Sequence, residues 1–98
     1  PKDVAETVGL PESFTLEQNY PNPFNPTTTI RYRLPEQSNV TLTIYDLTGR
    51  EVAELVNTTQ ASGEYTISLD ASSLASGVYV YRLKTPAYSA TRKMMLIK

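Results

Sequence analysis

The stretch YPNPFNPTTTIRYRL, residues 20–34, joins a proline-rich segment directly to an alternating β-strand. Each proline fixes its φ at about −65°, removes a backbone donor and pushes the preceding residue towards extended conformations, so residues 20–26 can form neither a helix nor a central strand. We expect a stiff, polyproline-like crossing that Tyr20 and Phe24 pin to a core. Such a rigid lead into a β domain points away from catalysis and towards a module attached to another protein.

Short segments downstream of the prolines alternate apolar and polar residues with the two-residue period of a β-strand. In residues 28–34, for example, this period places Ile30, Tyr32 and Leu34 on the inner face. No segment has the period of a helix. About seven short strands separated by turn signals predict an all-β fold, an antiparallel Ig-like β-sandwich. The strands are predicted over residues 14–16, 28–34, 40–45, 50–56, 64–70, 78–83 and 92–98.

The connections between these strands carry recognisable turn residues. Residues 46–49 fit a type I turn, because Asp46 stands at its first position and Gly49 at its fourth. The positive φ that such turns require is enough to explain their glycines, so a phosphate-binding loop is not needed to account for them. The other expected connections are the polar loops at 35–39, 57–63 and 85–90 and the small-residue stretch 71–77, which has room for one helical turn.

Length and composition limit the classes of function. The chain has 98 residues, a formal net charge of −1 and no cysteine, histidine or tryptophan. These counts exclude disulfide frameworks, zinc ribbons and most hydrolytic triads, and they give no electrostatic case for nucleic acid or anionic membranes. No apolar run approaches the roughly 18 residues of a membrane helix. We expect an acidic linker over residues 1–12 and one domain over residues 13–98, without a cofactor or a metal.

The cations are unevenly placed along the chain. After Asp70 there is no acidic residue, and the last stretch carries five cations: Arg82, Lys84, Arg92, Lys93 and Lys98. One interpretation is that these side chains protect strand edges from pairing with neighbouring molecules. The other is that a basic terminal hairpin meets an acidic receptor.

Carboxylates and tyrosines leave weaker alternatives. A glycosidase needs two carboxylates, but the acids here lie in turns or at outward strand positions, without the spacing of a calcium loop. Tyrosines can stack on sugars, but the alternation places Tyr32 and Tyr65 inward and Tyr79 and Tyr81 on a shared face. Two glycosylation sequons, at Asn39 and Asn57, are matches that arise often by chance.

Five blocks of the sequence stand out: residues 14–30, 40–56, 62–65, 74–83 and 93–98. Together they resemble the type A C-terminal sorting domains of the bacterial type IX secretion system. They follow the order and spacing of that family and cover nearly all of residues 13–98. One departure is Leu69 before Asp70, where many relatives carry a tryptophan. The Ig-like domain of flagellar hook-capping proteins shares several of the motifs and is the nearest competing family.

The resemblance implies a sorting signal without enzymatic activity, in exported proteins of Bacteroidota-like bacteria. A cargo domain fused to the N-terminal side would travel through the periplasm, and the type IX translocon and its shuttle components would carry it across the outer membrane to the cell surface or medium. A sortase-type protease would cut near Leu10, Pro11, Glu12 and Ser13. The domain would be a monomer without membrane insertion. The alternative is a carbohydrate-binding or structural accessory Ig-like module of a secreted enzyme.

Two groups of residues are candidates for these roles. Motif or structural roles are expected for Tyr20, Pro21, Asn22, Pro23, Phe24, Asn25, Pro26, Asp46, Gly49, Arg50 and Gly63. The terminal hairpin, residues 77–98, is our hypothesis for the element that the translocon recognises, with residues 92–98 as an accessible edge for β-augmentation or charge pairing. Its candidate recognition residues are Gly77, Val78, Tyr79, Tyr81, Arg92, Lys93, Met94, Met95, Leu96, Ile97 and Lys98.

Overall fold

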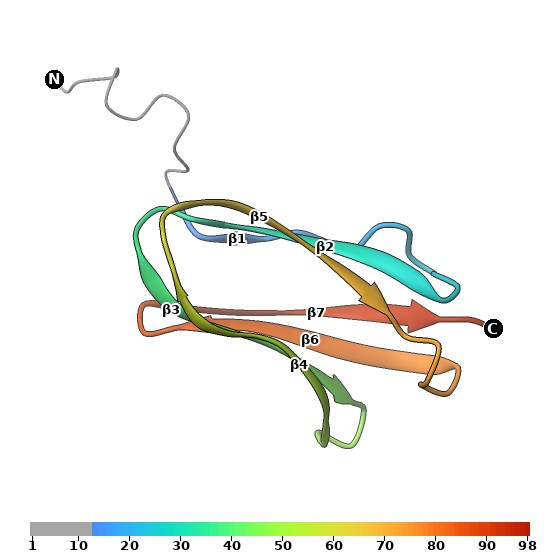
Figure 1. Cartoon of the computed structure of the whole chain (residues 1–98). Helices are drawn as coiled ribbons and strands as arrows, with labels where there is room; N and C mark the ends of the chain where they lie inside the picture. Colours follow the sequence, from blue (N-terminus) through green and yellow to red (C-terminus); the bar gives the residue numbers. More distant parts are fainter. Residues whose placement is uncertain (1–12) are drawn as a thin grey trace, which may run out of the picture.

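The computed structural model describes residues 13–98, which form two antiparallel β-sheets packed face to face (Figure 1). One sheet has the strand order β1-β2-β5 and consists of β1 (Thr15–Leu16), β2 (Thr27–Leu34) and β5 (Gly63–Asp70). The other has the order β4-β3-β6-β7 and consists of β3 (Ser38–Asp46), β4 (Glu51–Gln60), β6 (Gly77–Thr85) and β7 (Tyr88–Leu96). The expected seven-stranded antiparallel sandwich is confirmed.

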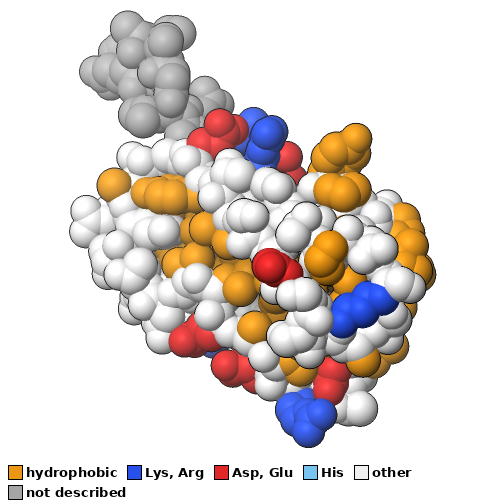
Figure 2. All heavy atoms as spheres, turned by 45° about the vertical axis from the view of Figure 1, so that its right-hand side comes forward, with side chains coloured by type: hydrophobic (Ala, Val, Ile, Leu, Met, Phe, Trp, Pro, Cys, Tyr) orange, Lys and Arg blue, Asp and Glu red, His pale blue; other side chains and the backbone are white. Residues whose placement is uncertain are grey.

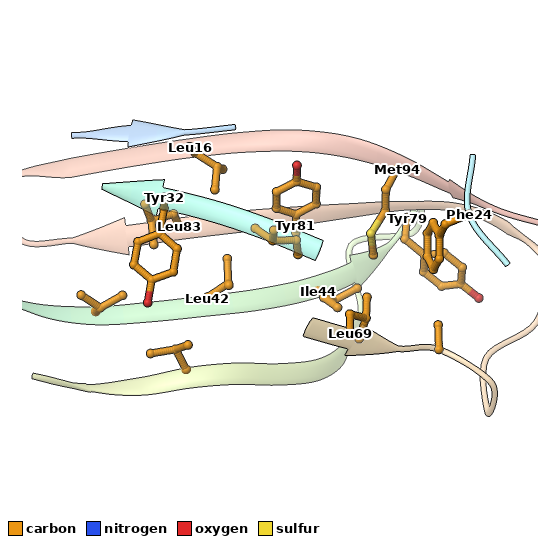
Figure 3. Packing of buried hydrophobic residues seen from close by; sticks show 14 of the residues in the cluster. Leu16, Phe24, Tyr32, Leu42, Ile44, Leu69, Tyr79, Tyr81, Leu83 and Met94 are labelled. Atoms are coloured by element: carbon orange, nitrogen blue, oxygen red, sulfur yellow. The ribbon is translucent and has the colours of Figure 1, made fainter. Parts of the chain in front are cut away.

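The two-residue period of the strands determines the core. On β2, Ile30, Tyr32 and Leu34 are fully buried, while the arginines between them are exposed. The buried side chains of both sheets meet between the layers, with Tyr32 close to Leu42 and Leu83 (Figure 3). Burying an aliphatic or aromatic side chain of this kind stabilises the fold by about 1.5–3 kcal/mol. The core therefore depends on the alternation that the sequence displays.

Two of the expected loops are much shorter in the structure. Residues 57–60 continue β4, because they pair with β3 up to the Ser38–Gln60 pair, so the connection to β5 is Ala61 and Ser62 alone. Likewise, β6 reaches Thr85 and β7 already begins at Tyr88. The expected loops at 57–63 and 85–90 were therefore wrong. Asn57, Thr58, Thr59 and Ser89 occupy solvent-facing strand positions, which such residues suit, while Thr85 is buried at the end of β6.

The proline segment also differs from its expected form. It bends at residues 21–23 and 25–26 instead of running as an extended polyproline helix. Phe24 is buried with 2% of its surface exposed, as expected, but Tyr20 is 81% exposed and its side chain does not anchor the segment to the core. Neighbouring residues of an extended chain face opposite sides, and here the inward place belongs to Asn19, which is 2% exposed. Between residues 71 and 77, turns take the place of a helical turn.

Candidate functional site

Residues 16–24, here called the clasp, lie along the outer edge of the terminal strand β7. The Phe24 amide donates to the Met95 carbonyl, and the Ile97 amide donates to the Phe24 carbonyl, both at 2.9 Å. The Met95 amide donates to Asn22 Oδ1, also at 2.9 Å. These three bonds pair the end of the chain with the proline segment, in which the Phe24 backbone both donates and accepts and the Asn22 side chain accepts.

The upstream half of the clasp continues this cover with side chains. Gln18 Nε2 donates to the Lys93 carbonyl at 2.7 Å. Arg92 Nε donates to the Leu16 carbonyl at 2.7 Å, which ties β7 to β1 across the open side of the sandwich. From Lys93 to Ile97 the edge of β7 is therefore occupied, although the sequence analysis expected it to be accessible for β-augmentation.

Tyr81 anchors the clasp from inside the core. Its hydroxyl donates to the Glu17 carbonyl at 2.6 Å and accepts the Asn19 amide at 2.8 Å. Burial raises the pKa of Tyr81 to about 12, so the hydroxyl keeps its proton and can donate. Asn19 Nδ2 in turn donates to Thr28 Oγ1 and to the Pro21 carbonyl, at 3.0 and 3.1 Å. The buried asparagine thus links the start of the proline segment to β2.

The sequence analysis missed the roles of Gln18 and Asn19. Both are amide side chains directly before a segment in which three prolines lack backbone donors. That combination is a signal that could have found them, because buried carbonyls in such a segment need donors from side chains.

The remaining motif residues mainly stabilise turns and bridges. Tyr20 exchanges two backbone hydrogen bonds with Thr29, each of 3.0 Å, and Pro26 accepts the Ala71 amide at 2.9 Å. Asn25 is exposed beside these contacts. Gly63 begins β5 opposite Leu34.

The turn after β3 forms as the sequence predicts. The Gly49 amide donates to the Asp46 carbonyl at 3.0 Å, and Gly49 has a φ of +90°. Asp46 Oδ1 accepts the Thr48 hydroxyl at 2.6 Å and the Arg50 amide at 3.1 Å. The Thr48 hydroxyl, and after it the Arg50 amide, hold the pKa of Asp46 below its ordinary value of 3.8. Asp46 therefore caps the turn, and this structural role explains its presence there without a catalytic one.

The candidate recognition residues of the terminal hairpin divide by burial. Four of them belong to the core and cannot touch a partner directly: Tyr79, Tyr81, Met94 and Leu96. Arg92 is exposed, but its guanidinium is engaged with the clasp. The remaining residues are exposed or half-buried: Gly77, Val78, Lys93, Met95, Ile97 and Lys98.

The solvent side of the hairpin combines apolar and cationic groups. Val78 lies opposite Met95, and Val80 lies opposite Lys93, in the ladder between β6 and β7. Met95 is 44% exposed. An open groove runs here, lined by Asn22, Val78, Lys93, Met94 and Met95. Figure 2 shows that hydrophobic side chains reach the surface in several places on the face turned to the viewer, with acidic and basic side chains among them.

A second groove lies on the same sheet, where the Asp46 turn meets β6. Its lining includes Tyr45, Leu47, Val80 and Arg82. The Arg82 guanidinium carbon is 5.4 Å from the centre of the Tyr45 ring, a cation–π contact that keeps a positive charge beside apolar surface.

The other chemical alternatives find little support in residues 13–98. That part of the chain holds no group of three or more acids able to bind a metal, and it has no helix long and apolar enough to cross a membrane. Tyr65 stacks on Tyr32, and Tyr88 stacks on Phe14. Among the described residues, Tyr20 alone of the tyrosines has a largely exposed ring, so no pair of flat aromatic faces is offered to a sugar.

The expected processing region is described only at its last residue. Ser13 is exposed. The expected linker over residues 1–12 lies outside the described residues, and so do Leu10, Pro11 and Glu12.

Comparison with known proteins identifies the family. The family that matches residues 18–98 is described as "Secretion system C-terminal sorting domain". A similar solved structure is that of PorZ, an essential bacterial surface component of the type-IX secretion system of Porphyromonas gingivalis. The two are 25% identical with a TM-score of 0.53, over 89% of this chain but only 12% of the PorZ chain. No curated protein matches.

The match extends over the clasp from Gln18 onward and over the terminal hairpin up to Lys98. Both elements of the candidate site therefore lie within the matched region. The chain belongs to the family of secretion system C-terminal sorting domains, and it is a sorting signal of type IX secretion, which directs proteins to the cell surface or medium.

Proposed function

We propose that this domain exports a cargo fused to its N-terminal side by presenting the solvent side of its terminal hairpin to the type IX translocon and its shuttle components. The cargo passes through the periplasm and then the outer membrane, and a sortase-type protease separates it near residues 10–13. The domain acts by binding and has no enzymatic activity. The absence of histidine and cysteine from the sequence is consistent with that role.

The observation that carries this proposal is the exposure of apolar side chains at the end of the hairpin. Met95 is 44% exposed and Ile97 is 49% exposed, although both flank core residues that are almost fully buried. Exposed apolar groups that lie together beside charges mark interaction surfaces more often than isolated ones do. Burying them against a partner would supply affinity, and the lysines around them would supply orientation.

The cations of the hairpin favour an acidic partner. The competing interpretation is that these cations protect a strand edge. At Lys93 such protection is not needed, because the clasp already covers this edge with hydrogen bonds to Lys93, Met95 and Ile97. The hairpin itself contains five cations and no acid. We therefore expect export to depend on these charges even where stability does not.

The test is export of a fluorescent protein with a periplasmic signal peptide in front and the 98-residue chain behind. The hosts are a strain with a working type IX translocon and a translocon-deficient strain. Lys93→Glu and Met95→Glu each place an acid on the groove, and we expect each to lower surface or medium fluorescence by about tenfold, equivalent to about 1.4 kcal/mol of binding.

The matched control is Arg31→Glu, the same charge change at an exposed position on the other sheet. It should export normally, and all variants should unfold at the same urea concentration as the parent chain. Equal export by Lys93→Glu, Met95→Glu and Arg31→Glu would show that the hairpin surface is not recognised. Periplasmic retention of the parent fusion in both strains would contradict the sorting role in this host.

A further inference from the structure

The sandwich has four edge strands, and three of them are guarded. The clasp covers β7, and β1 is only two residues long. On β4 the pairing with β3 shifts twice, which leaves Leu55 and Val52 as extra, bulged residues. Short strands, bulges and covering segments are the usual ways to keep an edge from pairing with another chain.

Within residues 13–98, the edge of β5 has none of these protections. β5 pairs with β2 without a register shift from Gly63 to Asp70. The backbone groups of Thr29 and Arg31 point to the β1 side, so their neighbours in β2 bond to the odd residues of β5. The amides and carbonyls of the even residues therefore face outward. These are Glu64, Thr66, Ser68 and Asp70, and no strand in residues 13–98 pairs with that side.

Apolar side chains beneath this edge are incompletely covered. Tyr65 and Ile67 of β5 are half-buried, in contrast to the fully buried residues opposite them on β2. Val52 and Leu55 of β4 are half-buried as well. Figure 3 shows β4 and β5 together at one side of the core, with β1 and β7 together at the other. A strand added beside β5 would bury apolar surface as well as complete a ladder.

The charges at this edge select what can be added. β5 carries two acids, Glu64 and Asp70, and no lysine or arginine, while Arg31 and Arg33 lie on its inner neighbour β2. If two copies paired antiparallel through β5, Glu64 of each would lie opposite Asp70 of the other, and like charges opposite each other destabilise a sheet. The Ser72 amide lowers the pKa of Asp70, which is ionised at neutral pH. Arg33 Nε of β2 forms an ion pair with Glu64 Oε2 at 2.7 Å, and the Glu64 side chain remains 55% exposed.

We propose that the β5 edge accepts an extended cationic strand of a partner protein by β-augmentation. Lysine or arginine side chains of that strand lie opposite Glu64 and Asp70, and small polar side chains lie opposite Thr66 and Ser68. Apolar residues between them cover Tyr65 and Ile67. This site is separate from the hairpin surface and does not depend on the proposal made for it, because it lies on the other sheet and attracts the opposite charge.

The test is a titration of the isotope-labelled 98-residue chain with the capped peptide Lys-Val-Thr-Val-Thr-Val-Lys, followed by nuclear magnetic resonance. We expect the largest shift changes at the amides of Thr66 and Ser68, with increased protection from hydrogen exchange. Thr66→Pro removes one outward amide at an edge position that tolerates proline, and it should weaken binding by about tenfold or more. Thr66→Val keeps the amide and should bind like the parent chain.

The charge requirement is tested with the peptide Glu-Val-Thr-Val-Thr-Val-Glu. It should bind much more weakly than the lysine peptide to the parent chain, and the double variant Glu64→Lys, Asp70→Lys should reverse this order. The proposal is overturned if the lysine peptide does not bind, or if it changes the amide chemical shifts of β7 or β4 in place of those of β5. It is also overturned if Thr66→Pro binds the peptide as tightly as Thr66→Val does, or if the lysine and glutamate peptides bind the parent chain equally.

Discussion

Replacing Tyr81 by phenylalanine removes a single oxygen atom that holds the clasp to the core. The hydroxyl donates to the Glu17 carbonyl and accepts the Asn19 amide, while the ring itself is fully buried. Phenylalanine fills the same volume, so no cavity of side-chain size appears. The change therefore isolates the two hydrogen bonds.

The expected loss follows from the burial of the groups left behind. A hydrogen bond contributes about 0.5–1.5 kcal/mol, and a buried donor left without a partner costs about 1–3 kcal/mol. Asn19 is 2% exposed, so water cannot readily replace the hydroxyl at its amide. We expect Tyr81→Phe to lower the free energy of unfolding by about 2–3 kcal/mol. In a domain of this size that loss lowers Tm by at least about 8 °C.

The measurement is urea unfolding followed by circular dichroism, with Tyr79→Phe as the matched control. Tyr79 lies on the same strand, but its hydroxyl makes one bond, to the carbonyl of the exposed Ala75, and water can replace it there. We expect the control to lose about 1 kcal/mol or less. In Tyr81→Phe alone, the amides of Met95 and Ile97 should exchange faster, since the clasp that accepts them is loosened. Equal losses in the two variants would refute the anchoring role of Tyr81.

Three further outcomes follow from the turn after β3 and from the buried tyrosines. Gly49→Ala should cost about 1–2 kcal/mol of unfolding free energy from backbone strain alone, because φ is +90° and an added Cβ meets no atom within 4 Å; urea unfolding measures it, and a neutral result would contradict the strain. The pKa of Asp46 is lowered, so its ionised form stabilises the fold above pH 3.8 and that contribution is lost as the pH falls through the lower folded value; Asp46→Asn should flatten the acid limb of a plot of stability against pH. Burial raises the pKa of Tyr32 and Tyr81 from 10.0 to about 12, so both stabilise the fold fully below pH 10.0 and less as the pH rises towards 12; phenolate absorbance should show these two ionising last, or only on unfolding.

The sequence predicts which segments form strands and which of their side chains face the core, because both depend on the local alternation of apolar and polar residues. The alternation along residues 28–34 determines which side chains of β2 are buried, and the structure agrees at Ile30, Tyr32 and Leu34. The ends of β4 and β7 could not be predicted as well. Threonine and asparagine suit both a loop and the solvent face of a strand, and only pairing with β3 decides between them at residues 57–60.

The clasp could not be predicted from local pattern, because its contacts join distant parts of the chain. Asn22 and Met95 are 73 positions apart, and Leu16 and Arg92 are 76 positions apart. The exposure of Tyr20 has the same origin: the inward position next to it is taken by Asn19, whose partner Tyr81 lies 62 positions away. Proline content correctly predicted that the segment is neither a helix nor a central strand, but not that it would pair with the terminal strand.

The clasp also changes how the terminal hairpin must be tested. Deleting residues 93–98 would remove Met94 and Leu96, each 1% exposed, together with every β7 group that pairs with Phe24 and Asn22. Truncating a buried methionine or leucine to alanine costs about 2–5 kcal/mol, so losing both approaches the entire stability of a small domain, about 5–15 kcal/mol. We expect the truncated chain to be unfolded, and its failure to be exported would then say nothing about recognition. The exposed side chains of Lys93 and Met95 are separable from the fold, since their backbones make the clasp bonds whatever the side chain. Only substitutions at such positions can show whether the translocon recognises the hairpin surface or merely requires a folded domain.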